Sequence, residues 1–452
     1  MSIALSLFGI FFGLFLLIVL TYKGLHVSWV SILVAILIMV TSGLAITDTW
    51  NNAITAGIAN IAGTMIPIYV AGATFGKLLS CTGAAESFAS TILKLAKNWS
   101  AQARRMFAAL LIIFMGILMS YAGIDNFAIL FTQIAIAASL MNEVGIPRRF
   151  ICVLIILGST TGGMLPGTPN IINIWGAQNL GTTAMAAPIL GVAGSAFIIV
   201  LSLLGLRRMW EKDIAGGAVF EYGPLAAANF DKDQLPPWFF LLIPVTIIFV
   251  CYNILGISAF FALLVGLAVA CVLLFPYLPK KAAEAGEKEH GAFIARLNTL
   301  VDSFNGGIEL AGIPAIIIIN QALGNLIAET PAFTWFCDLF SNVSGSPVVL
   351  FMIVSILIIG VSASPSGMFV MYNLANSLFI PVLGLDVAFA HRAIGFAGAV
   401  LDTVPFGNMV VSLLLLTGIK QKDGYPPIGF ATVGVTFLAC VFVTVLALCG
   451  IR

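Results

Sequence analysis

Residues 158–173, GSTTGGMLPGTPNIIN, break a strongly hydrophobic stretch with glycine, serine, threonine and proline. A similar break, SYAGIDNF, precedes it at 120–127, and two more follow in the second half of the chain, SASPSGMF at 362–369 and LDTVPFGNM at 401–409. Such breaks free backbone N–H and C=O groups that hydrocarbon cannot satisfy, so they persist only where they line a cavity enclosed by protein. The paired breaks therefore predict one polar cavity to which both halves of the chain contribute.

The composition is that of a polytopic membrane protein. Of the 452 residues, 60% are hydrophobic and only 9% are charged. Apolar runs of about 20 residues, the length of a spanning helix, recur along the whole chain. We therefore predict an all-α fold in the membrane, with the apolar run that begins at Ile3 retained as the first helix.

The apolar segments fall into two series separated by a polar stretch. The first series is 3–21, 26–43, 56–80, 106–121, 125–141, 149–165 and 186–206. The second series is 237–255, 257–277, 300–327, 346–361, 367–384, 389–402, 405–418 and 427–449. We divide the chain accordingly into a first repeat at 1–206, a linker at 207–236 and a second repeat at 237–452.

The charged residues and cysteines argue against several classes of protein. The net charge is +1 and there is no basic tract, so nucleic acid is not an expected partner. The seven cysteines are scattered, which argues against a disulfide framework or a metal site. The sequence contains no HExxH, GxSxG or Walker A motif, so we expect neither an enzyme nor ATP coupling, and no cofactor.

The second series reads as an inverted copy of the first. IPRRFICVLIILGSTTGGMLPGTPN, from Ile146, corresponds to AHRAIGFAGAVLDTVPFGN, from Ala390, and Asp125 stands where Ser366 stands. The segment at 81–105 carries Lys and Arg residues, whereas its counterpart at 326–345 has none. Under the positive-inside rule this predicts two inverted-topology repeats, with both termini outside and the linker in the cytoplasm.

Five segments in order resemble the gluconate permease (GntP) family, within the ion transporter superfamily of secondary transporters. They are SYAGIDNFAILF, NEVGIPRRF, LPGTPNIINI, HRAIGFAGAVLDTVP and GIKQKDGY. The resemblance implies import of a small organic monocarboxylate (a sugar acid, hydroxy acid or short carboxylate) by symport with H+ or Na+, usually H+. It also implies re-entrant hairpins, broken helices, and a scaffold plus a transport domain that moves as an elevator in a homodimer of the inner membrane.

The chain departs from the family pattern at the predicted cavity. Asp125 stands where Ser is usual, and Phe406-Gly407-Asn408 replaces a His-Asn-Gly run. A Phe in place of a polar His predicts a substrate that is smaller or less hydroxylated than gluconate.

An anionic substrate at the membrane midplane needs hydrogen-bond donors, which the N-termini of broken helices and nearby hydroxyl groups supply. The expected substrate-binding residues are Ser159, Thr160, Thr161, Gly167, Thr168 and Asn170 in the first half, and Ser362, Ser364, Ser366, Gly367, Thr403 and Asn408 in the second. The alternative is that these small residues only allow helices to pack closely.

Asp125 and Asp402 are the candidates for cation coupling. A carboxylate at membrane depth costs about 2.5–3.5 kcal/mol, so it is expected to be protonated, paired or bound to a cation. The alternative is a structural Asp that caps a broken helix. Arg148, Arg149, His391 and Arg392 stand near the starts of segments and are interpreted as anchors at the membrane interface, with contact to the substrate carboxylate as the alternative for Arg392.

Other functions stay open on the sequence alone. A sodium-coupled or exchange carrier for an organic anion fits the same residues. An anion channel fits less well, because no repeated ring of pore residues is visible.

Overall fold

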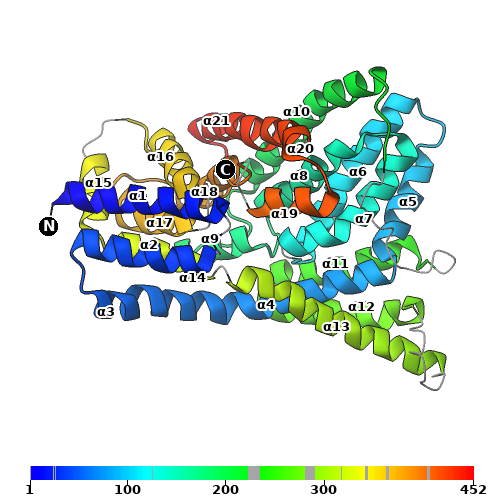
Figure 1. The fold of residues 1–452 in the computed structure, drawn as a ribbon, viewed down its shortest axis with the longest axis horizontal. Helices are drawn as coiled ribbons and strands as arrows, with labels where there is room; N and C mark the ends of the chain where they lie inside the picture. Colours follow the sequence, from blue (N-terminus) through cyan, green and yellow to red (C-terminus); the bar gives the residue numbers. More distant parts are fainter. Residues whose placement is uncertain are drawn as a thin grey trace.

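The computed structural model describes residues 2–23, 25, 27–124, 126–221, 235–279, 291–316, 318–341, 345–362, 366–404 and 408–452. Every regular element within these ranges is helical, as Figure 1 shows. The all-helical fold predicted from the sequence is thereby confirmed for the described residues.

The described helices follow one another along the two predicted halves of the chain. The first half contains α1 (Ile3–Tyr22), α2 (Val27–Ser42), α3 (Ile46–Thr49), α4 (Ala56–Cys81), α5 (Ala84–Leu95), α6 (Ala101–Tyr121), α7 (Asn126–Val144), α8 (Ile151–Met164), α9 (Ile171–Leu180) and α10 (Pro188–Ala215). The second half contains α11 (Leu242–Phe249), α12 (Ala259–Leu274), α13 (Ala292–Ile316), α14 (Ile318–Ala328), α15 (Pro331–Ser341), α16 (Pro347–Ser362), α17 (Ser366–Leu374), α18 (Val387–Val400), α19 (Asn408–Thr417), α20 (Gln421–Ile428) and α21 (Val435–Leu448). Four π-helical segments extend or join them: η1 (Trp50–Thr55), η4 (Val250–Ile254), η6 (Ala375–Phe379) and η7 (Gly429–Gly434).

Five helices were not predicted from the sequence, and α3 and α20 are the two shortest of them. The expected loops at 81–105 and 326–345 contain α5 and α15, and the expected break after residue 165 includes α9. In α5, Ala85, Phe88 and Leu93 face the core while Glu86 and Lys94 lie in the first and last turns. The charges of this amphipathic helix concealed its apolar face, which recurs with a helical period.

Helix α10 ends later than predicted. We expected the segment that starts at 186 to end at 206, but α10 continues to Ala215. The charged residues of the predicted linker therefore begin on a helix, and this extension reaches the ion pairs described below.

Two buried helices, α8 and α18, lie at the centre of the molecule (Figure 1). Every residue of α8 is buried, and α18 is buried from Phe389 to Phe396. A helix that is apolar on all sides belongs in the interior of a protein. Each of these two helices runs directly into one of the sequence breaks.

Close packing of α6 against α8 depends on small residues. A Cβ added to Gly158 would lie 3.1 Å from Gly116 Cα, and one added to Gly162 would lie 2.3 Å from Ser120 Oγ. Gly158 and Gly162 therefore allow α6 and α8 to pack closely.

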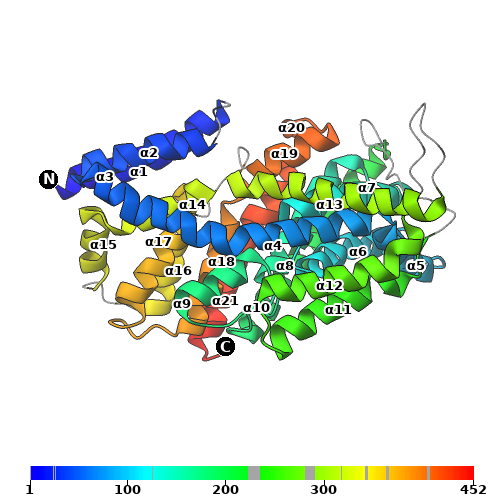
Figure 2. The same ribbon diagram turned by 90° about the horizontal axis from the view of Figure 1, so that it is seen from below.

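The long helices α4 and α13 lie side by side along one face, as Figure 2 shows. A Cβ on Gly307 of α13 would lie 2.6 Å from Thr74 Cα of α4. Helix α4 also meets the turn between α6 and α7, where the carbonyl oxygen of Gly123 lies 2.5 Å from the position of a Cβ on Gly72. At both places the helices approach one another backbone to backbone.

Candidate functional site

The two breaks of the first half lie together. Helix α6 ends at Tyr121, and Gly123 just after it has a φ of 68°, the left-handed conformation that favours glycine after a helix C-terminus. Tyr121, in the last turn of α6, donates from its hydroxyl to Pro166 O at 2.9 Å. Asn170 donates from Nδ2 to Asn126 Oδ1, at the start of α7, at 3.3 Å. The chain between α8 and α9 thus packs against the α6–α7 hairpin.

Residues 165–170, which we call the break loop, have a local structural cause. Leu165 precedes a proline and is extended, so α8 cannot continue through Pro166. Asn170 then caps α9, because its Oδ1 accepts from Ile172 N at 3.2 Å.

The carbonyl groups at this end of α8 are occupied by side chains from several helices. Arg392 donates to Met164 O at 3.1 Å, and Asn253 donates to Gly167 O at 2.7 Å. Asn173 Nδ2 donates to Leu165 O at 2.9 Å and to Thr168 O at 3.2 Å. With the Tyr121 bond to Pro166, each carbonyl from Met164 to Thr168 has a donor.

The backbone donors of the break loop differ from its acceptors. Gly167 N donates to Ala184 O at 2.9 Å. No described residue accepts from the N–H groups of Thr168, Asn170 or Ile171. Within the described chain, the break loop therefore has occupied acceptors and available donors, the combination that suits an anion at a helix N-terminus.

Arg392 is buried, with 2% of its surface exposed, and the expectation that it anchors the membrane interface is wrong. Its guanidinium donates to the carbonyls of Met164 (3.1 Å), Ala184 (2.5 Å) and Ala186 (2.6 Å), and to Asn173 Oδ1 (2.6 Å). All four acceptors are neutral. The sequence suggested an anchor because Arg392 stands near a helix start, but its partners lie more than 200 positions away in the chain.

His391 is also buried rather than interfacial, with 1% of its surface exposed. Its Nδ1 lies 2.7 Å from Thr182 Oγ1, and its ring packs against Gly176 of α9, where a Cβ would come within 2.5 Å of Nε2. Together with Arg392, His391 joins α18 of the second half to the α8–α10 region of the first.

The predicted hydroxyl donors of the first half are largely engaged. Thr160 and Thr161 bond back to Ile156 O and Leu157 O within α8. Thr168 is fully buried and accepts from Asn173 Nδ2 at 2.6 Å. Ser159 is fully buried, and no described residue is a hydrogen-bond partner of its Oγ.

The second half is described less completely. Asp125 and Ser364 lie outside the described residues, and the side chains of Ser362, Ser366 and Asn408, in α16, α17 and α19, are likewise outside them. Gly367 is buried in α17. Thr403 is buried, with its hydroxyl 2.5 Å from that of Thr432 in η7. Asp402 is partly buried and forms no hydrogen bond to the described residues.

Three residues that organise the site were missed by the sequence reasoning, namely Tyr121, Asn173 and Asn253, whereas Arg392 was named in a different role. Asn253 carried a usable signal, because a polar amide within an apolar segment has to find a partner inside the protein. Tyr121 and Asn173 lie within the breaks, where a polar side chain is expected, so nothing distinguished them from their polar neighbours.

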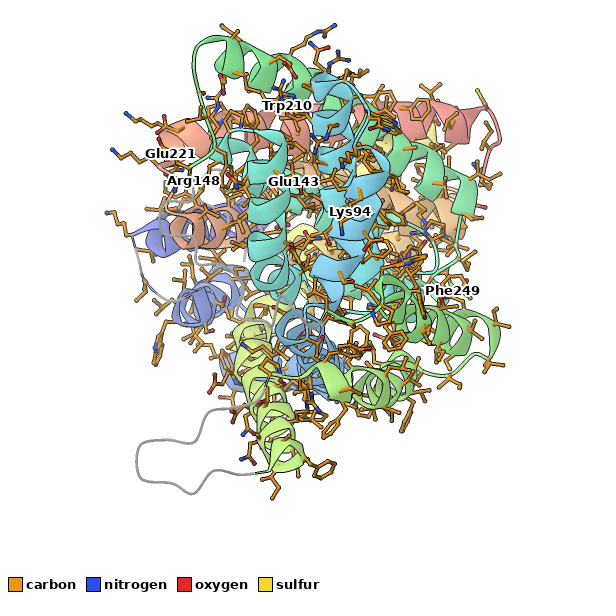
Figure 3. All side chains as sticks on the ribbon, turned by 90° about the vertical axis from the view of Figure 1, so that its right-hand side faces the viewer. Lys94, Glu143, Arg148, Trp210, Glu221 and Phe249 are labelled. Atoms are coloured by element: carbon orange, nitrogen blue, oxygen red, sulfur yellow. The ribbon has the colours of Figure 1, made fainter. Side chains whose placement is uncertain are left out.

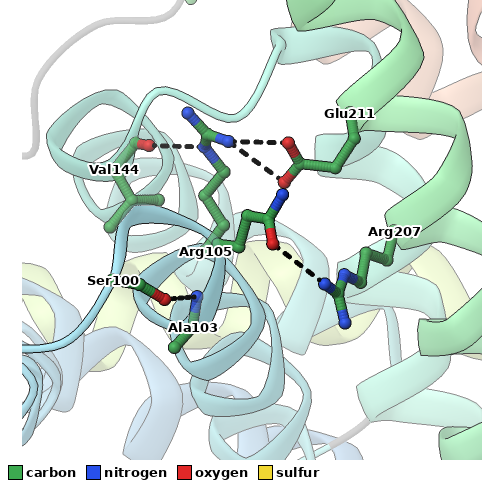
Figure 4. Close-up of polar contacts among 7 residues, drawn as sticks. Ser100, Ala103, Arg105, Val144, Arg207 and Glu211 are labelled. Atoms are coloured by element: carbon green, nitrogen blue, oxygen red, sulfur yellow. Dashed lines mark hydrogen bonds and ion pairs between the residues drawn. The ribbon is translucent and has the colours of Figure 1, made fainter.

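A group of ion pairs lies at the end of the molecule that faces the viewer in Figure 3. Arg105 of α6 pairs with both carboxylate oxygens of Glu211, at 3.0 and 2.9 Å, and Figure 4 shows this contact. Arg149, before α8, pairs with Asp213 at 2.5 Å. These bonds hold the extension of α10 against the starts of α6 and α8.

Comparison with known proteins identifies the family. The family model of the GntP family permeases matches residues 5–265. The chain belongs to this family. The uncharacterized transporter YxjC of Bacillus subtilis (strain 168) is 24% identical over 503 residues, covering 99% of this chain and 100% of YxjC.

A solved structure shows a related fold. The YdaH transporter of Alcanivorax borkumensis, described as having an unusual topology, matches with a TM-score of 0.53 at 15% identity, over 88% of each chain. Among the described residues, four helices are long and apolar enough to cross a membrane, namely Ala101–Tyr121, Pro188–Ala215, Ala259–Tyr277 and Gln421–Leu448. This GntP permease is thus an integral protein of the cell membrane and a secondary transporter, not an enzyme.

Proposed function

We propose that this permease imports a small organic monocarboxylate (a sugar acid, hydroxy acid or short carboxylate) together with a cation, H+ in the first instance. The observation that carries the proposal is the break loop, whose carbonyls are occupied while the N–H groups of Thr168, Asn170 and Ile171 have no acceptor among the described residues. A carboxylate binds through donors and is repelled by free carbonyl oxygens. The break loop offers N–H donors, and its carbonyl oxygens are already occupied.

The charge of Arg392 supports an anionic substrate. No carboxylate among the described residues lies within ion-pair distance of its guanidinium, and its four acceptors are carbonyl and amide oxygens. A buried charge without an opposite partner keeps its field, because screening is weak inside a protein. This field favours one negative charge on a ligand nearby.

We further propose that the two halves are inverted repeats that provide a scaffold and an elevator-type transport domain. The contacts between helices that the repeat would pair support this, namely α4 with α13, α8 with α18, and α10 with α21. Helix α9 of the first half contacts α18 of the second, and α19 of the second half contacts α8 of the first, as a two-fold relation requires. A two-fold relation between the halves accounts for all five contacts.

Cation coupling is assigned to a carboxylate at one of the breaks, Asp125 first and Asp402 second. Asp402 lies at the end of α18 without a hydrogen bond to any residue that the structure describes, so it can gain and lose a cation without breaking a structural contact. A homodimer, which the family resemblance implies, remains a prediction.

Counterflow into proteoliposomes tests the proposed function. Vesicles loaded with an unlabelled acid should take up the same labelled acid faster than empty vesicles, because a carrier exchanges substrate across the membrane. The screen covers gluconate, glycerate, lactate, hydroxybutyrate and short fatty acids, with pH and sodium varied separately. Labelled flux without acceleration indicates the alternative, an anion channel, and absence of flux for every acid refutes a monocarboxylate substrate.

The inverted topology has a separate test. Single cysteines at Asn98 and Asp338 should react with an impermeant thiol reagent from opposite sides of the membrane, because the charge bias of their segments is opposite. Labelling of both positions from one side contradicts the inverted repeat. Background thiols are removed first, including the exposed Cys449.

A further inference from the structure

We infer that Arg392 is a positioning residue, which sets the shape of the break loop from the other half of the protein without touching the substrate. This inference rests on the proposed function only for its effect on substrate affinity. The geometry that carries it consists of three features: the set of acceptors, a relay through Asn173, and a strained segment before α10.

The acceptors of Arg392 come from two separate segments. Met164 O and Asn173 Oδ1 flank the break loop, whereas Ala184 O and Ala186 O belong to the connection between α9 and α10. Guanidinium has five N–H groups in a rigid planar fork, and four hydrogen bonds occupy most of them. A group engaged in this way holds two pieces of backbone at a fixed separation and has little capacity left for a ligand.

The relay through Asn173 carries this constraint into the break loop. Because Oδ1 accepts from Arg392 at 2.6 Å, the Nδ2 group of the same amide is turned toward Thr168. Nδ2 then donates to Thr168 Oγ1 at 2.6 Å and to Leu165 O at 2.9 Å. An amide that is not fixed by Arg392 can turn over and present an oxygen to these acceptors.

The connection after α9 stores strain beside Arg392. Ala187 has φ of 40°, the only positive φ outside glycine in the described chain. Left-handed conformations of this kind cost about 1–3 kcal/mol and persist only where neighbouring contacts hold them. The bonds from Arg392 to Ala184 O and Ala186 O are such contacts.

Two variants separate the planar shape of the Arg392 guanidinium from its charge. Arg392→Lys keeps the positive charge and loses the fork, while Asn173→Ala keeps the fork and loses the relay. If Arg392 acts by position, each variant should raise the KM for uptake about tenfold, as expected for about 1.4 kcal/mol of lost hydrogen bonding, with maximal counterflow within about twofold of wild type. The double variant should be no worse than the more affected single variant, because both interrupt one relay.

Hydrogen exchange on the purified protein provides a readout that needs no substrate. Peptides that cover residues 164–176 should exchange faster in Arg392→Lys and in Asn173→Ala than in wild type. The matched control is Asn376→Ala, which also removes a bond from the second half to a first-half carbonyl, Asn179 O at 2.7 Å, but lies at the far end of α9. It should leave both the exchange of this peptide and the KM unchanged.

The outcomes distinguish failure of the inference from failure of the proposed function. Unchanged exchange in both variants, or a wild-type KM in Arg392→Lys, overturns the positioning role. A wild-type KM in Arg392→Lys would also show that a positive charge at position 392 is sufficient for substrate affinity. Faster exchange in a protein that transports none of the acids supports the positioning role and rejects the monocarboxylate.

Discussion

The arginines of this permease are held in two contrasting ways. Arg105 and Arg149, at the end of the molecule, pair with Glu211 and Asp213 through side chains that are 16–33% exposed. Arg392, at the centre, is 2% exposed and donates only to neutral oxygens. Peripheral charges are neutralised locally and contribute little, since surface ion pairs are worth about 0–1 kcal/mol.

Of these three arginines, the one that lacks a counterion in the described chain lies at the buried centre and not at the periphery. A buried cation is costly unless hydrogen bonds satisfy it, and Arg392 has such bonds but no counterion among the described residues. The protein therefore maintains a positive centre beside the break loop, while the carboxylates that pair with Arg105 and Arg149 lie on the C-terminal extension of α10. Substitutions at the two places should differ accordingly.

The largest effect is expected for Arg392→Ala. It leaves three oxygen acceptors without a donor, on Met164, Asn173 and Ala186, whereas Ala184 O keeps the N–H of Gly167. The free energy of unfolding should therefore fall by about 3 kcal/mol or more, and uptake should be lost. Thermal unfolding in detergent, followed by tryptophan fluorescence, measures the first effect, and proteoliposome uptake measures the second. A variant with the wild-type Tm and KM would remove the contrast between central and peripheral arginines.

Loss of coupling without loss of binding is expected next, for Asp125→Asn. Asn resembles a protonated Asp but cannot exchange a proton, so accumulation against a gradient should disappear while counterflow persists. Asp402→Asn is the matched comparison at the break of the second half. Accumulation that survives in Asp125→Asn, with unchanged dependence on pH and sodium, shifts the coupling role to Asp402.

A smaller effect is expected for Thr168→Val. The substitution keeps the shape and removes the hydroxyl that accepts from Asn173, so substrate binding should weaken by about 1–3 kcal/mol. Thr444→Val is the control, because that hydroxyl bonds only to Cys440 O within α21. Equal affinity in the two variants, measured by counterflow, would mean that the break loop does not shape the site.

The smallest effect is expected for Glu211→Gln. It removes the charge that pairs with Arg105, so stability should fall by about 0.5–1 kcal/mol while KM stays unchanged. The loss in Tm should shrink at high salt, since partly exposed pairs are screened. A large change in KM would show that the peripheral ion pairs act on the site after all.

The sequence was informative about the backbone and less so about the partners of its side chains. The breaks and the helices around them were located because proline, glycine and apolar runs act locally, as at Pro166 and Gly123. The role of Arg392 was not predictable in the same way. It depends on carbonyls of Met164 and Ala184 that only the folded chain brings near, and a backbone carbonyl leaves no mark in a sequence.

The amphipathic helices show a second limit of the sequence. The charges at 81–105 favoured a loop, and they concealed the apolar face that α5 buries. Hydrophobicity averaged over a span-length window detects helices that cross a membrane and overlooks those that lie along a surface.

The contact between α4 and the α6–α7 turn has a mechanical consequence. At Gly72 and Gly123 neither helix presents a side chain to the other, and a carbonyl oxygen occupies the space of a Cβ. At this point the two backbones are in direct contact, so no side chain separates α4 from the hairpin. A methyl group at Gly72 would collide with the carbonyl oxygen of Gly123, so Gly72→Ala would force the hairpin away from α4.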